Sequence, residues 1–208
     1  SRSCAEVAAH LRELGAPATA DQVFGSALAG AELLAREVAS GSAVLVVGSQ
    51  ILADSVRAQG LVVVSAWDDQ PDAVIQGFSP ALGWKDLAAA AYAITAGATW
   101  VATNMDMTLP QERGLAPGNG TLVAAVAAAT GKWPLVAGKP EAALFETAAR
   151  HSGVERALVV GDRLDTDILG GNRAGMETAL VLTGVDSPQT ALTARVDERP
   201  RYLIRSFE

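Results

Sequence analysis

The sequence predicts an α/β fold with a mostly parallel sheet, and two observations support this prediction. From Val44 onward, short apolar runs alternate with helical patterns, which is the order of elements in a parallel sheet whose strands are joined by helices. Hydrophobic residues make up 50% of the 208 residues and aromatic residues only 5%, which suits alanine-rich helices packed on valine-rich strands. A chain of this length accommodates one large domain or about two small ones.

Two helices are predicted before the alternating region. Ser3 and Glu6 have the spacing of a capping box, and apolar residues then recur at helical spacing, which predicts a helix over 3–14. A second capping signal at Thr19–Gln22 begins a helical pattern that continues as far as Gly41.

The alternating region begins with four short apolar runs. They predict strands at 44–47, 61–64, 73–75 and 99–102, with helices at 50–59 and 84–96. The run at 73–75 has short flanks, so we expect it to be an edge strand or a hairpin partner.

The stretch from Asn104 to Gly120 is predicted to be the longest irregular segment, because proline and glycine recur in it. A helix over 120–130 follows. Gly118 and Gly120 resemble part of a dinucleotide-binding fingerprint, but Val123 occupies the third glycine position, which argues against that interpretation.

The C-terminal part continues the alternation. A short strand ends before Gly138 and Lys139, and Pro140 is expected in the first turn of a helix over 140–151. Further elements are predicted as strand 157–160, helix 167–174, strand 178–182, helix 188–194 and strand 202–204.

Charge and composition argue against several classes of function. The net charge is −7 without a cluster of lysine and arginine, so a nucleic-acid partner is not expected. No apolar run approaches the ~18 residues of a membrane helix, so no membrane partner is expected either. The single Cys4 excludes an internal disulfide and suits the cytoplasm. His10 and His151 lie far apart on predicted helices, which argues against a zinc site or a Ser-His-Asp triad.

An acidic stretch follows the strand predicted at 157–160, whose uninterrupted apolar character favours burial on both faces. Gly161 is expected to let the chain turn sharply, and Asp162, Asp165 and Asp167 come next. Ligands of open α/β sheets bind beyond the carboxyl ends of the strands, and carboxylates suit Mg²⁺. The alternative is a solvated helix start, because aspartate and threonine are good N-cap residues.

Lys139 occupies a place equivalent to that of Asp162, since each follows a short strand and a glycine and precedes a helix. In one parallel sheet both side chains would project from the same edge. A lysine that faces carboxylates and a divalent cation is a phosphate site in outline. The alternative is an ordinary exposed lysine.

These motifs resemble a known family. Gly138-Lys139-Pro140, followed by the segment from Gly161 to Ile168, looks like the third and fourth motifs of the haloacid dehalogenase superfamily of phosphatases. The loop that begins at Asn104 and ends in Pro117-Gly118-Asn119-Gly120 is similar to the branch with a large α/β cap, which includes 4-nitrophenyl, phosphoglycolate, glycerol-3-phosphate and pyridoxal phosphatases.

The resemblance implies a Rossmann-like parallel-sheet core with an inserted α/β cap domain. The implied division is core over 1–19, cap over 20–130 and core again over 131–208. We expect the core to be incomplete, with its first two strands missing, because Ser1-Arg2-Ser3 looks like the residues just after the second motif of the family.

The resemblance also implies roles for single residues. Asp162 matches the magnesium ligand, Asp167 the second acid, which orients metal-bound water or the lysine, and Lys139 the residue that holds the phosphate and the nucleophile. Asp165 matches no fixed role, so its interpretation as a helix cap stays open. Candidates for substrate selection follow a predicted strand end in the cap and are Asn104, Asp106, Leu109 and Arg113; the alternative is that they only shape the loop.

The sequence departs from the family at the nucleophile. No Asp-x-Asp motif follows an early apolar strand, and Asp165-Thr166-Asp167 lies in the wrong place for it. We therefore expect that the 208-residue polypeptide neither phosphorylates itself nor hydrolyses substrate, and that its core is unstable.

The function implied is Mg²⁺-dependent hydrolysis of small phosphomonoesters, of the glycerol-3-phosphate or phosphoglycolate type, through an aspartyl-phosphate. The expected partners are a small phosphate ester and a second copy of the chain bound through the cap. The alternative from another class is a non-catalytic binding or regulatory remnant. A dinucleotide-dependent oxidoreductase would need the glycine loop already rejected at Val123.

Overall fold

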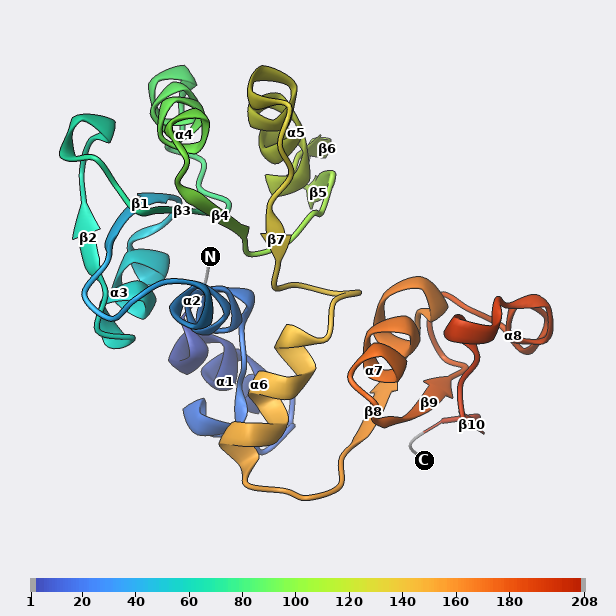
Figure 1. Cartoon of the computed structure of the whole chain (residues 1–208). Coiled ribbons are helices and arrows are strands. Elements are labelled where there is room, and N and C mark those ends of the chain that lie inside the picture. The colour runs from blue at the N-terminus through green and yellow to red at the C-terminus, as the bar shows by residue number, and fades with distance from the viewer. Residues whose placement is uncertain (1–2, 207–208) are drawn as a thin grey trace. The chain divides into compact units, whose positions relative to one another are not determined.

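The computed structural model describes residues 3–206 of the chain (Figure 1). It divides into two compact units, one up to Ala137 and the other from Gly138 onward. The domain boundaries expected after residues 19 and 130 stay predictions, because a compact unit need not coincide with a core domain or its insertion.

The first unit begins with the helical segments α1 (Cys4–Glu13), η1 (Ala20–Gln22) and α2 (Ser26–Glu37). The capping boxes at Ser3 and Thr19 are both present, as the sequence predicts. The single helical pattern expected from Thr19 to Gly41 is wrong, because Val23 and Gly25 have extended backbone and separate a short 3₁₀ turn from α2.

A five-stranded parallel sheet forms the centre of the first unit. Its order is β2 (Val62–Val64), β1 (Ala43–Val47), β3 (Ala73–Gln76), β4 (Thr99–Ala102) and β7 (Leu135–Val136). The prediction that residues 73–75 form an edge strand or hairpin partner is wrong. β3 lies between β1 and β4 and all four of its residues are buried, because an apolar strand covered on both faces shows no polar alternation.

Helices cover both faces of this sheet (Figure 1), namely α2 and α3 (Gln50–Ala58) on one face and α4 (Trp84–Ala96) and α5 (Asn119–Thr130) on the other. Alternate residues of β1 show the two layers. Leu45 and Val47 pack with α4 and α5, whereas Val44 packs with α2 and α3. A 3₁₀ turn, η2 (Trp67–Asp69), precedes β3.

The stretch from Asn104 to Gly120 contains a β-hairpin, so the prediction of an irregular segment is wrong for its middle part. β5 (Thr108–Gln111) pairs antiparallel with β6 (Gly114–Pro117), with Leu109 opposite Ala116. Gly114 has φ +122, a left-handed conformation that few other residues adopt, which explains a glycine where the hairpin turns.

The second unit contains a three-stranded parallel sheet in the order β10 (Tyr202–Ile204), β9 (Glu177–Val181) and β8 (Leu158–Gly161). Its helical segments are α6 (Ala143–Ser152), η3 (Leu164–Ile168), α7 (Leu169–Arg173), α8 (Pro188–Thr193) and η4 (Val196–Glu198). Leu164 and Ile168 pack against Leu180 of the central strand and form the core on this face.

β8 is an edge strand within residues 3–206, so the prediction that it is buried on both faces is wrong. It pairs only with β9, and Leu158 and Val160 remain 49% and 39% exposed. β7 pairs with β4 instead, so the strands that precede Lys139 and Asp162 do not share a sheet in the described part of the chain.

Pro140 lies before a helix rather than in its first turn. Glu141 N donates to Gly138 O at 3.0 Å, which closes a turn around Lys139 and Pro140, and α6 begins at Ala143. No helix described between residues 3 and 206 combines the length and apolar character that a membrane crossing requires.

Candidate active site

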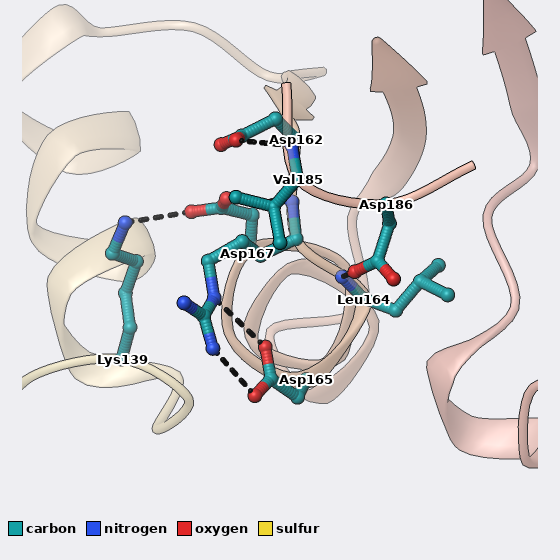
Figure 2. A network of polar contacts seen from close by, with 8 residues as sticks. Lys139, Asp162, Leu164, Asp165, Asp167, Val185 and Asp186 are labelled. Carbon is teal, nitrogen blue, oxygen red and sulfur yellow. Dashed lines mark hydrogen bonds and ion pairs between the residues drawn. The ribbon is translucent and has the colours of Figure 1, made fainter. Parts of the chain in front are cut away.

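An ion pair joins two of the predicted site residues. Lys139 Nζ lies 2.6 Å from Asp167 Oδ1, where the lysine comes from the turn before α6 and the aspartate from η3 (Figure 2). Asp167 is 8% exposed and its partner is half-exposed. A nearly buried carboxylate needs donors to offset its desolvation, and Lys139 supplies the charged one.

Asp167 reaches this position through an unusual turn. η3 is a π-helix, in which Ile168 N and Asp167 N both donate to Arg163 O, at 3.1 and 3.0 Å. Arg163 N in turn donates to Asp167 Oδ2 at 3.2 Å, so both carboxylate oxygens of Asp167 have a donor. Single π turns are rare and occur frequently at functional sites.

Gly161 is required by packing, and the sharp turn predicted there is not its reason. It is not among the residues with positive φ. A Cβ at this position would lie 2.2 Å from Asp167 Cβ and 2.6 Å from Asp167 Oδ2. The end of β8 and the Asp167 side chain can therefore approach this closely only if residue 161 is glycine.

Asp162 is held by the loop after β9. Its Oδ2 accepts a hydrogen bond from Val185 N at 3.0 Å, and its backbone oxygen accepts one from Asp186 N at 3.0 Å. A Cβ at Gly184 would lie 2.2 Å from Asp162 Oδ2. Sequence reasoning missed this loop, although it follows the strand beside β8 at the same carboxyl end of a parallel sheet, which is the signal that could have located it.

The carboxylates of Asp162 and Asp167 are of the ligand type that Mg²⁺ prefers. The carboxylates of Asp162 and Asp167 point to the same side of the end of β8, the side on which Lys139 lies (Figure 2). Within the described residues no three acidic, histidine or cysteine side chains converge on one point. Because Mg²⁺ is commonly bound through one or two carboxylates together with water and substrate phosphate, these residues fit it as a partial ligand set.

Asp165 does not cap the helix, so that interpretation is wrong. Its carboxylate oxygens accept two hydrogen bonds from Arg163, at 3.0 and 2.9 Å from Nε and Nη2, and the N-cap of η3 is Arg163, without a side-chain bond. The bidentate bond to Arg163 lowers the pKa of Asp165, and the same bond raises the pKa of Arg163.

The four cap candidates belong to the first unit. Asn104 Oδ1 accepts from Asp106 N at 3.2 Å, a bond within its own loop, and a role in substrate selection stays a prediction. Leu109 lies in β5 and is half-buried, and Arg113 is exposed at the hairpin turn. The first unit places these residues in and beside one hairpin.

Asn119, the first residue of α5, is bonded to this loop, and the sequence singled it out only as part of the family motif. It is 1% exposed, and its Nδ2 donates to Asn104 O at 2.7 Å. Gly118 and Gly120 flank it because a Cβ at either position would meet the backbone oxygen of Asp106 or Met105. The Gly-Asn-Gly sequence therefore serves close packing of this loop.

Two family models match the chain. The haloacid dehalogenase-like hydrolase model matches residues 1–62, and the HAD-hydrolase-like model matches residues 136–208. Among known relatives, D-glycerol 3-phosphate phosphatase of Mycobacterium tuberculosis is 55% identical over 203 residues, which are 98% of this chain and 58% of that protein. The 5′-nucleotidase YutF of Bacillus subtilis is 37% identical over 187 residues, 89% of this chain and 72% of that protein.

Solved structures agree with this result. The glycerol phosphate phosphatase from Mycobacterium tuberculosis in complex with magnesium aligns with a TM-score of 0.92 at 55% identity, over 98% of this chain and 62% of that one. A thermostable NPPase from Geobacillus stearothermophilus aligns with a TM-score of 0.90 at 33% identity, over 99% of this chain and 79% of that one. The chain thus spans 58% of the length of the first relative.

Proposed function

Because this chain belongs to the haloacid dehalogenase-like hydrolases, we propose that it provides the phosphate-binding and magnesium-binding side chains of a phosphomonoester hydrolase. The observation that carries the proposal is the ion pair of Lys139 with Asp167 beside Asp162 at the end of one strand. The Lys139 ammonium suits a phosphoryl group, and the two carboxylates next to it suit a divalent cation bound together with that group.

Asp162 and Asp167 are the residues proposed to hold Mg²⁺. When bound, the cation neutralises charge on the phosphoryl oxygens. The Lys139 ammonium would bind an equatorial phosphoryl oxygen and reduce the repulsion between the phosphate and an attacking carboxylate. Asp167 holds that ammonium in place through the 2.6 Å ion pair.

The chemical step proposed is displacement by an aspartate. A carboxylate oxygen attacks phosphorus, the ester P–O bond breaks, and an acid protonates the leaving alcohol; water then releases phosphate from the aspartyl-phosphate. No residue of the printed sequence is assigned as the nucleophile, since no Asp-x-Asp motif stands in the required context.

The proposed substrates are small phosphomonoesters of the glycerol-3-phosphate or phosphoglycolate type. Support comes from the 55% identity to a D-glycerol 3-phosphate phosphatase. Asn104, Asp106, Leu109 and Arg113 would contact the leaving group, with apolar Leu109 suited to a small alcohol. No observation favours the non-catalytic alternative.

We further propose that the protein is cytoplasmic and pairs with a second copy through the cap.

The test is a hybrid protein in which these 208 residues replace the segment of the Mycobacterium tuberculosis phosphatase to which they align. Phosphate release is measured with glycerol 3-phosphate, phosphoglycolate, a sugar phosphate and a nucleoside 5′-monophosphate, with and without Mg²⁺. We expect Mg²⁺-dependent turnover with the first two substrates preferred. A folded hybrid without phosphatase activity would contradict the proposal.

A further inference from the structure

Asp186, in the loop after β9, bonds to the candidate metal-binding segment on both sides of Arg163. We propose that Asp186 is a positioning residue, which fixes the backbone from Asp162 to Leu164 and thereby orients the Asp162 carboxylate toward the cation. The inference rests on the proposed function, since it assigns a role in the same site.

Asp186 makes two contacts with this segment. Its backbone N–H donates to Asp162 O at 3.0 Å, and its side-chain Oδ2 accepts from Leu164 N at 2.8 Å. One residue therefore bonds to the peptide groups before and after Arg163. Two bonds from a single residue restrict both the position and the rotation of this segment.

The Asp162 carboxylate is itself restrained by the same loop. Val185 N donates to Asp162 Oδ2 at 3.0 Å, which restricts the rotation of the carboxylate. Val185 precedes Asp186 directly, so the bonds of Asp186 also hold the Val185 amide in place. Gly184 allows this approach, because a Cβ there would lie 2.3 Å from Asp162 Cβ.

Asp186 lies apart from the residues proposed to bind the cation. Figure 2 shows it on the opposite side of the loop from Lys139, with its carboxylate beside Leu164. Its Oδ2 accepts from the Leu164 amide on that far side of the loop, so the side chain is placed to hold the loop. Partners that orient metal ligands in this way commonly contribute about 10–100-fold to metal affinity.

Two substitutions separate the geometry of Asp186 from its charge. Asp186→Asn keeps an oxygen that can accept from Leu164 N–H and removes the charge. Asp186→Glu keeps the charge and displaces the oxygen by one methylene. The backbone bond to Asp162 O is available in both variants. If Asp186 acts by its position, Asp186→Asn should retain metal binding and Asp186→Glu should lose it. If its charge is what matters, the reverse is expected.

The experiment uses the hybrid protein with two readouts: Mn²⁺ binding without substrate, measured by electron paramagnetic resonance, and the Mg²⁺ concentration for half-maximal turnover. We expect Asp186→Glu to weaken both by about 10-fold or more, with kcat at saturating Mg²⁺ largely kept, and Asp186→Asn to stay within about 3-fold. Asp54→Asn is the control, because this exposed carboxylate pairs with Arg57 on α3, within the first unit.

The outcomes separate the two proposals. If Asp186→Glu binds Mn²⁺ as the unaltered hybrid does, or if Asp186→Asn is the variant that loses binding, the positioning role is overturned while the proposed function stands. A loss of kcat without a change in metal affinity also overturns it, since that is the result of a merely structural role. If the unaltered hybrid binds no divalent cation, both proposals fail together.

Discussion

Lys139 is the residue whose charge the proposed chemistry requires most. Its ammonium is paired with Asp167 at 2.6 Å, and the side chain is half-exposed and so open to solvent. The Gly-Lys-Pro sequence singled out this residue, and the family resemblance implied that Asp167 orients metal-bound water or the lysine. The ion pair agrees with the second option, whereas the π turn of η3 that brings Asp167 to Lys139 was not predicted.

Replacing Lys139 by alanine in the hybrid is expected to lower kcat/KM by about 10²–10³-fold, because a positioned donor to the developing phosphoryl charge is lost. Steady-state phosphate release measures the effect. Lys85→Ala, at an exposed position of α4, is the control and should retain activity. Activity of Lys139→Ala equal to that of the control would contradict the role.

The pair of Asp165 with Arg163 should make the stability of the folded state depend on pH. The hydrogen bond with Arg163 lowers the pKa of Asp165 from 3.8. The pair therefore stabilises the folded state above pH 3.8, and this stabilisation is lost as pH falls through the pKa of the folded state. The pair is exposed, so Asp165→Asn should cost about 0.2–1 kcal/mol at pH 7. Urea unfolding should show this difference shrinking toward pH 3; a constant or growing difference would exclude the ion pair as its cause.

The close approach of β8 to η3 depends on Gly161. Gly161→Ala should displace Asp167, since the new Cβ would lie 2.2 Å from Asp167 Cβ, and so weaken both the Lys139 ion pair and cation binding. Mn²⁺ binding in the hybrid tests this, with a loss of about 10-fold or more expected. Gly25→Ala is the control, because a Cβ there meets nothing within 4 Å. Equal binding by the two variants would refute the packing argument.

The β5–β6 hairpin carries the prediction about substrate choice. Leu109→His replaces a half-buried apolar side chain in β5 by a polar one that can be charged, so the preference of the hybrid among the four phosphate esters should move toward larger or more polar alcohols. Ratios of kcat/KM report this preference. Leu115→His, on the exposed face of β6, is the control. An unchanged ranking in Leu109→His would count against the proposed contact.

Elements predicted from periodicity were mostly confirmed, and three of the errors share one cause. The helix over 84–96 and the strand over 99–102 have the predicted bounds, because a strong pattern and a following Gly97 mark them locally. The position of β3 within the sheet, the hairpin at 108–117 and the exposure of β8 depend on which segments pair in space. A linear pattern does not contain that information.

Membership of the haloacid dehalogenase-like hydrolases is the property of the whole chain that was predicted best from the sequence. Two motifs, around Lys139 and Asp162, identified the haloacid dehalogenase resemblance, and the comparisons confirm it across 98% of the chain. Asp186, Gly184 and Asn119 could not be assigned in this way, since their roles are contacts with Asp162 and Asn104 that only the folded chain creates.

A Mg²⁺ titration of phosphate release by the hybrid and by its Asp162→Asn variant, with glycerol 3-phosphate as substrate, tests whether Asp162 belongs to the metal site. We predict saturable Mg²⁺ dependence in the unaltered hybrid. In the variant we predict a loss of about 10²–10³-fold in kcat/KM, because one of two anionic oxygen ligands becomes a neutral amide. Turnover that is independent of Mg²⁺, or equal in both proteins, would contradict the assignment of Asp162 to the metal site.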